Sequence, residues 1–214
     1  MANKVSAYTG SNRLLVEGKT DLHVVLALRN AHKVPQNFGI YECGSDGLAL
    51  KQLDALIISA DPPGVLGVVI DADSPNLTGR WQSIKSILGE YKYDCPVEPE
   101  PTGTIIDSVM EQPRLGFWLM PNNRLDGMLE DFCIEMIDPS AIATVVQCLQ
   151  IAEDNQCTSF KPVHRSKAIV HNLPRMARRA WETIGTIDHR TYPPSRNRNR
   201  KSIHELADGI VSLV

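Results

Sequence analysis

The segment 65–70 (VLGVVI) constrains the fold more than any other part of the chain, because it is apolar throughout. A strand that is apolar on both faces belongs to a parallel sheet that helices cover on both sides. The run is also far shorter than the roughly 20 residues that a membrane-spanning helix needs. We therefore predict a buried strand at 65–70 and no membrane partner.

Strand-like and helix-like segments alternate on both sides of this run. Strands are predicted at 14–16, 38–43, 65–70, 103–106 and 115–120. Helices are predicted at 21–32, 48–58, 80–91, 129–137 and 139–152, where apolar residues recur at helical spacing. This alternation predicts an α/β fold with a mainly parallel, Rossmann-like sheet and right-handed crossovers.

The length of 214 residues corresponds to one domain or a tight pair of domains. We expect an α/β core over 1–137 and a helical, basic extension over 138–214 that packs on it, as one compact domain. The N-terminus has no apolar signal segment, so we expect a cytoplasmic protein. Five scattered cysteines without a C-x-x-C pair indicate reduced thiols and argue against zinc.

Charge is distributed unevenly along the chain. The segment 155–201 contains eleven of the 22 basic residues but only two of the 25 acidic ones. An acidic part followed by a basic part suits an enzyme that holds metal cations in one place and a polyanion in another. The alternative is a solvated basic helix with a loop. The residues predicted to bind nucleic acid are Arg178, Arg179, Arg196, Arg198, Arg200 and Lys201.

Acidic residues follow several of the predicted strands. Glu17 ends the first strand, Asp71 and Asp73 end the third, and Asp46 lies in the loop after the second. Ligands of an open parallel sheet bind beyond the carboxyl ends of its strands, so these acids are expected at one edge. Residues two apart on an extended segment point to the same side, which predicts that Asp71 and Asp73 act together.

Crowded carboxylates repel one another, and a divalent cation removes that conflict. Oxygen ligands favour Mg²⁺ or Mn²⁺ over zinc. Helix capping is the alternative, because Asp21 and Asp73 both precede predicted helices. For Glu17 and the Asp71/Asp73 pair we favour the metal.

These motifs resemble those of the TOPRIM domain, which occurs in topoisomerases, DnaG-type primases, recombination-repair proteins and overcoming-lysogenization-defect nucleases. VEGKTD (16–21) is similar to its first motif and VVIDADS (68–74) to its second. The chain is most similar to small stand-alone TOPRIM-like proteins of the DUF3226 type. It shares with them a GSDG loop (44–47), the segment FWLMPNNRLDGMLEDF (117–132) and a lysine, Lys167, before a short helix.

The resemblance implies roles for the acids at the strand ends. Glu17 matches the TOPRIM glutamate, a metal ligand or general acid/base, and Asp71 and Asp73 match the metal-binding aspartates. Many TOPRIM enzymes have a longer acidic run in the second motif than this chain, whose run stops at Asp73. The number of metal ions therefore stays open.

Likeness to the overcoming-lysogenization-defect nucleases implies further site residues. Asp21 and Glu130, or Asp131 in place of Glu130, would complete a second metal site, and Lys167 would contact phosphate. Asn122 and Asn123 stand where the wider family has an aspartate, and they are left out of the site.

The implied function is metal-dependent hydrolysis of phosphodiester bonds in DNA or RNA, with Mg²⁺ or Mn²⁺ stabilising the developing charge. Proteins of this kind often accompany phage-defence or mobile-element functions. The chain has no GxxxxGK motif, so any ATPase would be a separate chain.

Two other functions stay open at this stage. The first is a non-catalytic TOPRIM-like module that binds nucleic acid or a partner ATPase. A homo-oligomeric partner is a separate expectation. The second is a phosphatase of the haloacid-dehalogenase type, because VVIDADS superficially resembles the Asp-x-Asp strand of that family. Pro75 stands where that motif has Thr or Val, which argues against the phosphatase.

Overall fold

The computed structural model describes residues 3–4, 8–73 and 76–176. The chain divides into two compact units, residues 1–128 with 201–214 and residues 129–200. The division follows Met128, whereas the sequence placed a boundary after residue 137. Each unit is described below by itself.

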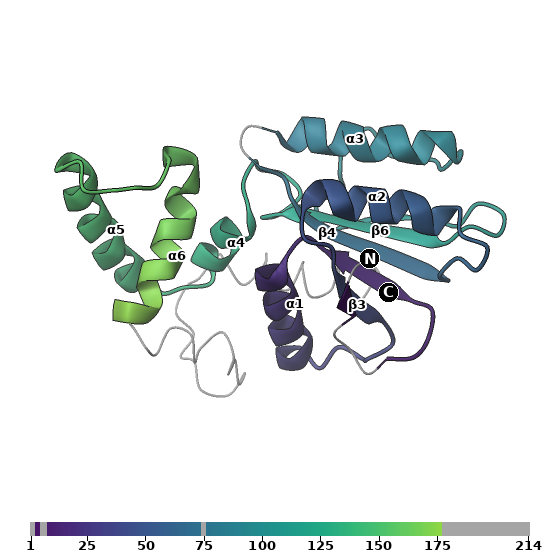
Figure 1. Cartoon of the computed structure of the whole chain (residues 1–214), viewed down its shortest axis with the longest axis horizontal. Coiled ribbons are helices and arrows are strands. Elements are labelled where there is room, and N and C mark those ends of the chain that lie inside the picture. The colour runs from purple at the N-terminus through teal and green to yellow at the C-terminus, as the bar shows by residue number, and fades with distance from the viewer. Residues whose placement is uncertain (1–2, 5–7, 74–75, 177–214) are drawn as a thin grey trace. The chain divides into compact units, whose positions relative to one another are not determined.

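The first unit is built on a six-stranded sheet with the strand order β1-β3-β2-β4-β6-β5 (Figure 1). Its strands are β1 (Asn3–Lys4), β2 (Arg13–Val16), β3 (Gly39–Glu42), β4 (Val65–Asp71), β5 (Thr104–Ile106) and β6 (Arg114–Met120). The inner four strands pair in parallel, and β1 and β5 pair antiparallel at the two edges. The mainly parallel sheet predicted from the sequence is confirmed.

Helices flank the sheet on both faces. The helices α2 (Asp46–Ile57) and α3 (Leu77–Glu90) cover one face, and α1 (Lys19–Ala31) covers the other (Figure 1). Their side chains pack against alternate residues of the strands, as the period-two geometry of a strand requires. The predicted α/β, Rossmann-like class is thus confirmed.

The three helices begin two or three residues before their predicted starts. The prediction used the first apolar residue of each period, but hydrogen bonds to the free amides of the first turn set the real starts. The Ser45 hydroxyl accepts from the Leu48 N–H at 3.2 Å at the start of α2. At the start of α3, the Asp126 carboxylate accepts from the Leu77 N–H at 2.8 Å.

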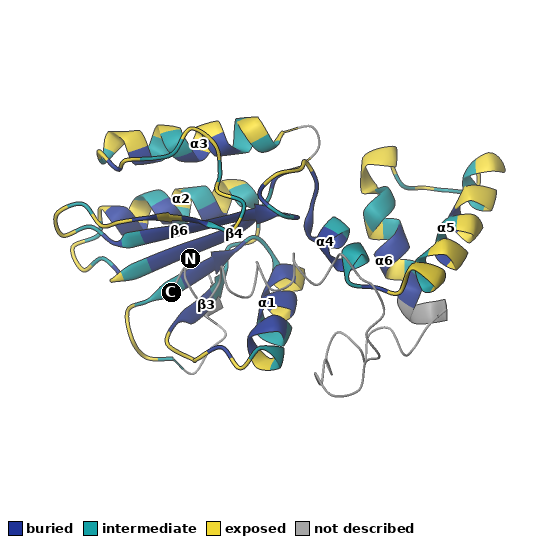
Figure 2. Cartoon of the chain, turned by 180° about the vertical axis from the view of Figure 1, so that it is seen from behind, coloured by how far each residue is buried: buried dark blue, intermediate teal, exposed yellow. Residues whose placement is uncertain are grey.

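The described residues of the sheet interior are buried (Figure 2), and their side chains are apolar apart from Thr104 of β5. In β4, residues 66–70 are all buried, which confirms the prediction for the apolar run. On the face beneath α2 and α3, the rings of Trp81 and Phe117 meet edge to face, with centroids 6.0 Å apart and an interplanar angle of 79°. The Trp81 Nε1–H also donates to the Pro96 carbonyl at 3.2 Å, so the buried indole keeps a polar partner.

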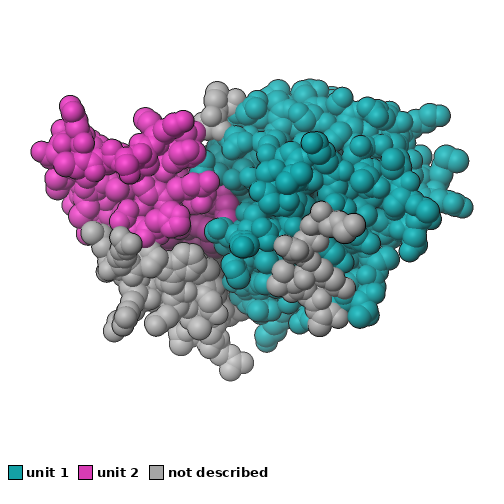
Figure 3. All heavy atoms as spheres, viewed as in Figure 1, with its two compact units in different colours: residues 1–128, 201–214 teal, residues 129–200 magenta. Residues whose placement is uncertain are grey.

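Figure 3 shows the second unit in magenta, and its described part, residues 129–176, is helical. It contains α4 (Leu129–Glu135), α5 (Pro139–Asp154), a 3₁₀ turn (Pro162–His164) and α6 (Arg165–Met176). A small apolar core includes Val145, Leu149 and Leu173. Lys167 lies inside α6, not before a helix as the sequence suggested. No helix in the described ranges is long and apolar enough to cross a membrane.

Candidate active site at the carboxyl edge of the sheet

Glu17 follows β2 directly and is partly buried. Because β2 pairs in parallel with β4, the ends of the two strands meet, and the Asp71 N–H donates to Glu17 Oε2 at 3.4 Å. Burial raises the pKa of Glu17, and the nearby Asp21, Asp46 and Asp73 carboxylates raise it further, while the Asp71 hydrogen bond opposes the shift. Negative charge therefore accumulates at this edge.

Asp71 is the last residue of β4, and Asp73 follows in a different backbone conformation. Asp73 has a φ of 64°, so the segment is no longer extended there. The argument that extended geometry sends both carboxylates to one side is therefore wrong at Asp73. Two backbone hydrogen bonds of 2.7 Å to Gly127 hold Asp73 in this conformation instead.

Arg80, in the first turns of α3, binds three acceptors at this edge. Its Nη1 pairs with Asp46 Oδ2, and its Nη2 pairs with Asp73 Oδ2 at 2.6 Å. Its Nε–H donates to the Asp71 carbonyl oxygen at 3.2 Å. The Arg80 side chain is only 11% exposed, so its charge lies among the acids and not in solvent.

These contacts divide the acids into two groups. Burial opposes the charge of Arg80, but Asp46 and Asp73 outweigh it and raise the pKa of the guanidinium. Burial also opposes ionisation of Asp46, yet the Gly47 N–H and Arg80 together lower the pKa of that carboxyl. Arg80 thus offsets one of the two negative charges of Asp46 and Asp73, and the charge of Glu17 is not fully compensated.

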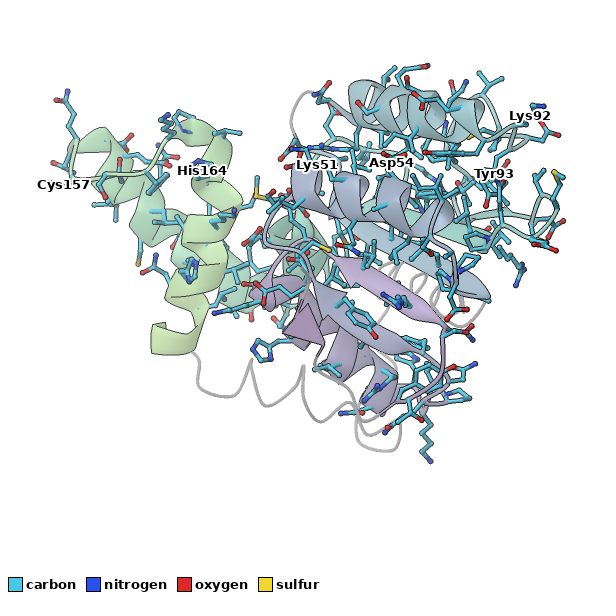
Figure 4. All side chains as sticks on the ribbon, turned by 45° about the vertical axis from the view of Figure 1, so that its right-hand side comes forward. Lys51, Asp54, Lys92, Tyr93, Cys157 and His164 are labelled. Atoms are coloured by element: carbon cyan, nitrogen blue, oxygen red, sulfur yellow. The ribbon has the colours of Figure 1, made fainter. Side chains whose placement is uncertain are left out.

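The positions of Asp46 and Arg80 follow from the helices that carry them. Asp46 opens α2 after a tight turn in which Gly44 has a φ of 96°, a conformation that favours glycine. Just beyond the far end of α3, the Tyr91 hydroxyl donates to Asp54 Oδ1 of α2 at 2.5 Å (Asp54 is labelled in Figure 4). The two helices are thereby linked at both ends.

Asp46 and Arg80 are the residues of this edge that the sequence-based site omitted. The sequence pattern places Asp46 at the edge but outside the site, and it assigns Arg80 only to the start of a helix. The sequence does contain a signal for Arg80. It is a basic residue one helical turn into the helix that follows the acidic pair Asp71 and Asp73.

Asp21 lies in the first turn of α1 and is buried. Its Oδ2 accepts from the Gly18 N–H at 3.1 Å, which ties the helix start to the end of β2. This contact matches the capping alternative, and it places Asp21 beside Glu17, whose pKa it raises.

Asn122 and Asn123 organise the loop after β6. The Asn123 Oδ1 accepts from the Leu119 N–H at 2.7 Å, and the Asn122 Oδ1 accepts from the Leu125 N–H at 3.1 Å. Their oxygens hold the loop that carries Gly127, the partner of Asp73.

Glu130, Asp131 and Lys167 belong to the second unit. Glu130 is buried in the first turn of α4, and Lys167 is exposed on α6. The Ser166 hydroxyl donates to Asp131 Oδ1, which links α4 to α6 next to Lys167. The predicted nucleic-acid residues Arg178, Arg179, Arg196, Arg198, Arg200 and Lys201 lie outside the described residues.

The carboxylates at the edge fit a hard cation chemically, because every donor is an oxygen. In the described ranges, however, no three His, Cys, Asp or Glu side chains are arranged to hold a metal ion. The Arg80 guanidinium pairs with the oxygens of Asp46 and Asp73. A metal ion that takes the paired oxygen of Asp73 would therefore replace that ion pair.

Comparison with known proteins gives one match. The family model described as "Protein of unknown function (DUF3226)" matches residues 11–186, most of the chain. No curated protein and no solved structure matches the chain. The matched range includes every residue of the acidic edge as well as α4, α5 and α6.

Proposed function

Because the chain belongs to the DUF3226 family, whose description records no function, we propose its activity from the geometry of the acidic edge. We propose a divalent-metal-dependent nuclease of the TOPRIM type that hydrolyses phosphodiester bonds in DNA or RNA. The TOPRIM likeness of the motifs around Glu17 and Asp71 supports this class. A cytoplasmic role in defence against phages, or in mobile-element biology, is part of the same proposal.

One observation carries the proposal: carboxylates from neighbouring parallel strands meet at the edge where such sheets bind ligands. Glu17 contacts the backbone of Asp71, and Asp73 lies close enough to raise the pKa of Glu17. A cation is the ligand that relieves such repulsion, and carboxylates select Mg²⁺ or Mn²⁺.

The chemistry that Mg²⁺ or Mn²⁺ supplies in such a site is stabilisation of phosphoryl charge and activation of water. In this proposal Glu17, Asp71 and Asp73 hold the ion, and Asp21 is a candidate ligand of a second one. The TOPRIM likeness leaves open that Glu17 acts as the general acid/base in place of binding the ion.

A specific observation favours a second function, a non-catalytic module that binds nucleic acid or a partner ATPase. Arg80 already pairs with Asp46 and Asp73 without a metal ion. Ion pairing thus accounts for part of the acidic charge at this edge without a catalytic role.

The test incubates the purified full-length chain with supercoiled plasmid, linear duplex DNA or single-stranded RNA, with Mg²⁺ or Mn²⁺ and then with EDTA. We expect metal-dependent cleavage of at least one substrate. The Asp71→Asn variant should lose about 1,000-fold or more, because each tenfold corresponds to about 1.4 kcal/mol of barrier. Asp61→Asn is the matched control, since Asp61 is exposed and precedes the other end of β4.

The outcomes separate the candidates. Cleavage lost in Asp71→Asn and kept in Asp61→Asn supports the nuclease. Retarded migration of nucleic acid without cleavage supports the binding module. Release of phosphate from a monoester, with DNA and RNA intact, would point to the phosphatase instead.

A further inference from the structure

We propose that Arg80 is a phosphate-positioning residue that a divalent cation releases by displacing it from Asp73. This inference rests on the proposed nuclease function and names a residue that neither the family match nor the TOPRIM motifs assign. Its basis is the set of contacts that Arg80 makes at the acidic edge.

The three Arg80 contacts are not equivalent. The Asp73 side chain is 52% exposed and that of Asp46 is 36% exposed, so Asp73 is the carboxylate that a hydrated cation reaches more easily. Asp73 is also the residue that the second motif assigns to metal. A cation that takes Asp73 therefore removes one of the two ion pairs of Arg80.

Arg80 remains at the edge after this exchange, in which a cation replaces Arg80 at Asp73. Its ion pair with Asp46 and its hydrogen bond to the Asp71 carbonyl do not involve Asp73. The exchange thus frees the Nη2 side of a guanidinium that is still held at Nη1 and Nε. A planar guanidinium with free N–H groups matches the oxygens of a phosphate, and its charge cannot be lost by deprotonation.

The exchange also accounts for two facts about the edge. The carboxylates have the chemistry of a metal site, yet in the described ranges they do not form one. The guanidinium is largely buried although it belongs to a residue type that is usually exposed. Both facts follow if the positive charge of Arg80 pairs with these carboxylates while no cation is bound.

The first measurement is Mn²⁺ affinity by isothermal titration calorimetry on the full-length chain. Arg80→Gln removes the competing charge and should bind Mn²⁺ about fivefold more tightly, the change expected from one exposed ion pair. Arg114→Gln is the matched control, because Arg114 begins β6 at the opposite edge of the sheet, and it should bind as the wild type does.

The second measurement is the salt dependence of DNA binding by fluorescence anisotropy, with a labelled oligonucleotide and Ca²⁺, which also takes oxygen ligands. Losing one phosphate contact should lower the slope of log K against log salt by about 0.9 in Arg80→Gln. In EDTA the slopes of the variant and the wild type should agree. A merely structural role of Arg80 would not produce this dependence on the cation.

Arg80→Lys guards against a variant that fails to fold, because it keeps the charge and removes the fork. It should keep the wild-type Mn²⁺ affinity and also the wild-type slope in Ca²⁺, because counterion release depends on the charge that meets phosphate and not on the fork. A lowered slope in Arg80→Lys would contradict a phosphate contact made by the charge of residue 80.

Unchanged or weaker Mn²⁺ binding by Arg80→Gln overturns the inference, and so does an unchanged salt slope of this variant in Ca²⁺. The proposed function stands separately, as long as the wild type cleaves nucleic acid in a metal-dependent way. If neither the wild type nor Arg80→Gln binds Mn²⁺, the inference and the metal site both fail.

Discussion

The interior of the sheet and its carboxyl edge are built from the same strands but are stabilised in different ways. In β2 and β4, Leu15, Val68 and Ile70 are buried and belong to the hydrophobic core. One residue beyond each strand interior, Glu17 and Asp71 begin the charged edge. The interior gains free energy by excluding water, whereas the edge keeps a partly buried charge that opposes folding.

The comparison teaches that the residues that stabilise the sheet and the residues proposed to act on a ligand are neighbours along the same strand. Substitutions in the interior should therefore lower stability and leave the chemistry of the edge intact. Substitutions at the edge should change ligand binding and should alter stability less, with signs that depend on each residue's partner. Four predictions test this contrast.

The largest effect is expected in the interior. Trp81→Ala removes a side chain that is 2% exposed and leaves a cavity against Phe117, so the free energy of unfolding should fall by about 3–5 kcal/mol. Urea denaturation followed by circular dichroism measures it. Leu48→Ala is the control, because Leu48 is 51% exposed, and it should change stability by less than about 0.5 kcal/mol. Equal losses in the two variants would contradict the contrast.

The next effect is a ligand effect at the edge. Mg²⁺ or Mn²⁺ at 100 times its dissociation constant should stabilise the wild type by about 2.7 kcal/mol, because it binds only the folded chain. Thermal unfolding with and without EDTA measures the shift. Asp71→Asn should lose most of it, and Asp61→Asn should keep it. The same stabilisation in Asp71→Asn would place the ion elsewhere.

Glu17→Gln should stabilise the fold by about 1 kcal/mol at neutral pH, the scale of a single stabilising substitution. The folded chain raises the pKa of Glu17, so between the unfolded and folded pKa values the folded state binds more protons, and wild-type stability falls as pH rises. The advantage of the variant should therefore disappear below the ordinary carboxyl pKa. Urea titrations from acid to neutral pH test this, and a less stable variant at neutral pH would refute it.

Asp46→Asn should have the smallest effect and the opposite sign. It removes one half-exposed ion pair of Arg80, so the loss should stay below about 1 kcal/mol at neutral pH. The folded chain lowers the pKa of Asp46, so the wild-type advantage is present above the unfolded pKa and is lost as pH falls through the folded one. The same pH series checks it, and a gap that widens in acid would contradict the assignment.

Much of the fold could be predicted from local pattern. The run at 65–70 predicted a buried parallel strand, and the structure has β4 (Val65–Asp71) there. The helix starts were less accurate, because side chains distant in sequence help to fix them, as Asp126 does for α3. The gathering of Glu17, Asp71 and Asp46 at one edge was also predictable, since the carboxyl ends of parallel strands meet.

The sequence by itself determined the α/β class, the buried strands and the edge at which the acids end, because these depend on apolar periodicity and on strand direction. Only the tertiary structure decided how those acids are partnered. Asp46 and Arg80 are 34 residues apart, and their ion pair exists because α2 and α3 cover the same face of the sheet. Asp73 turns toward Arg80 because a neighbouring loop holds its backbone. Electrostatic pairing depends on distance in space, which a sequence pattern does not record.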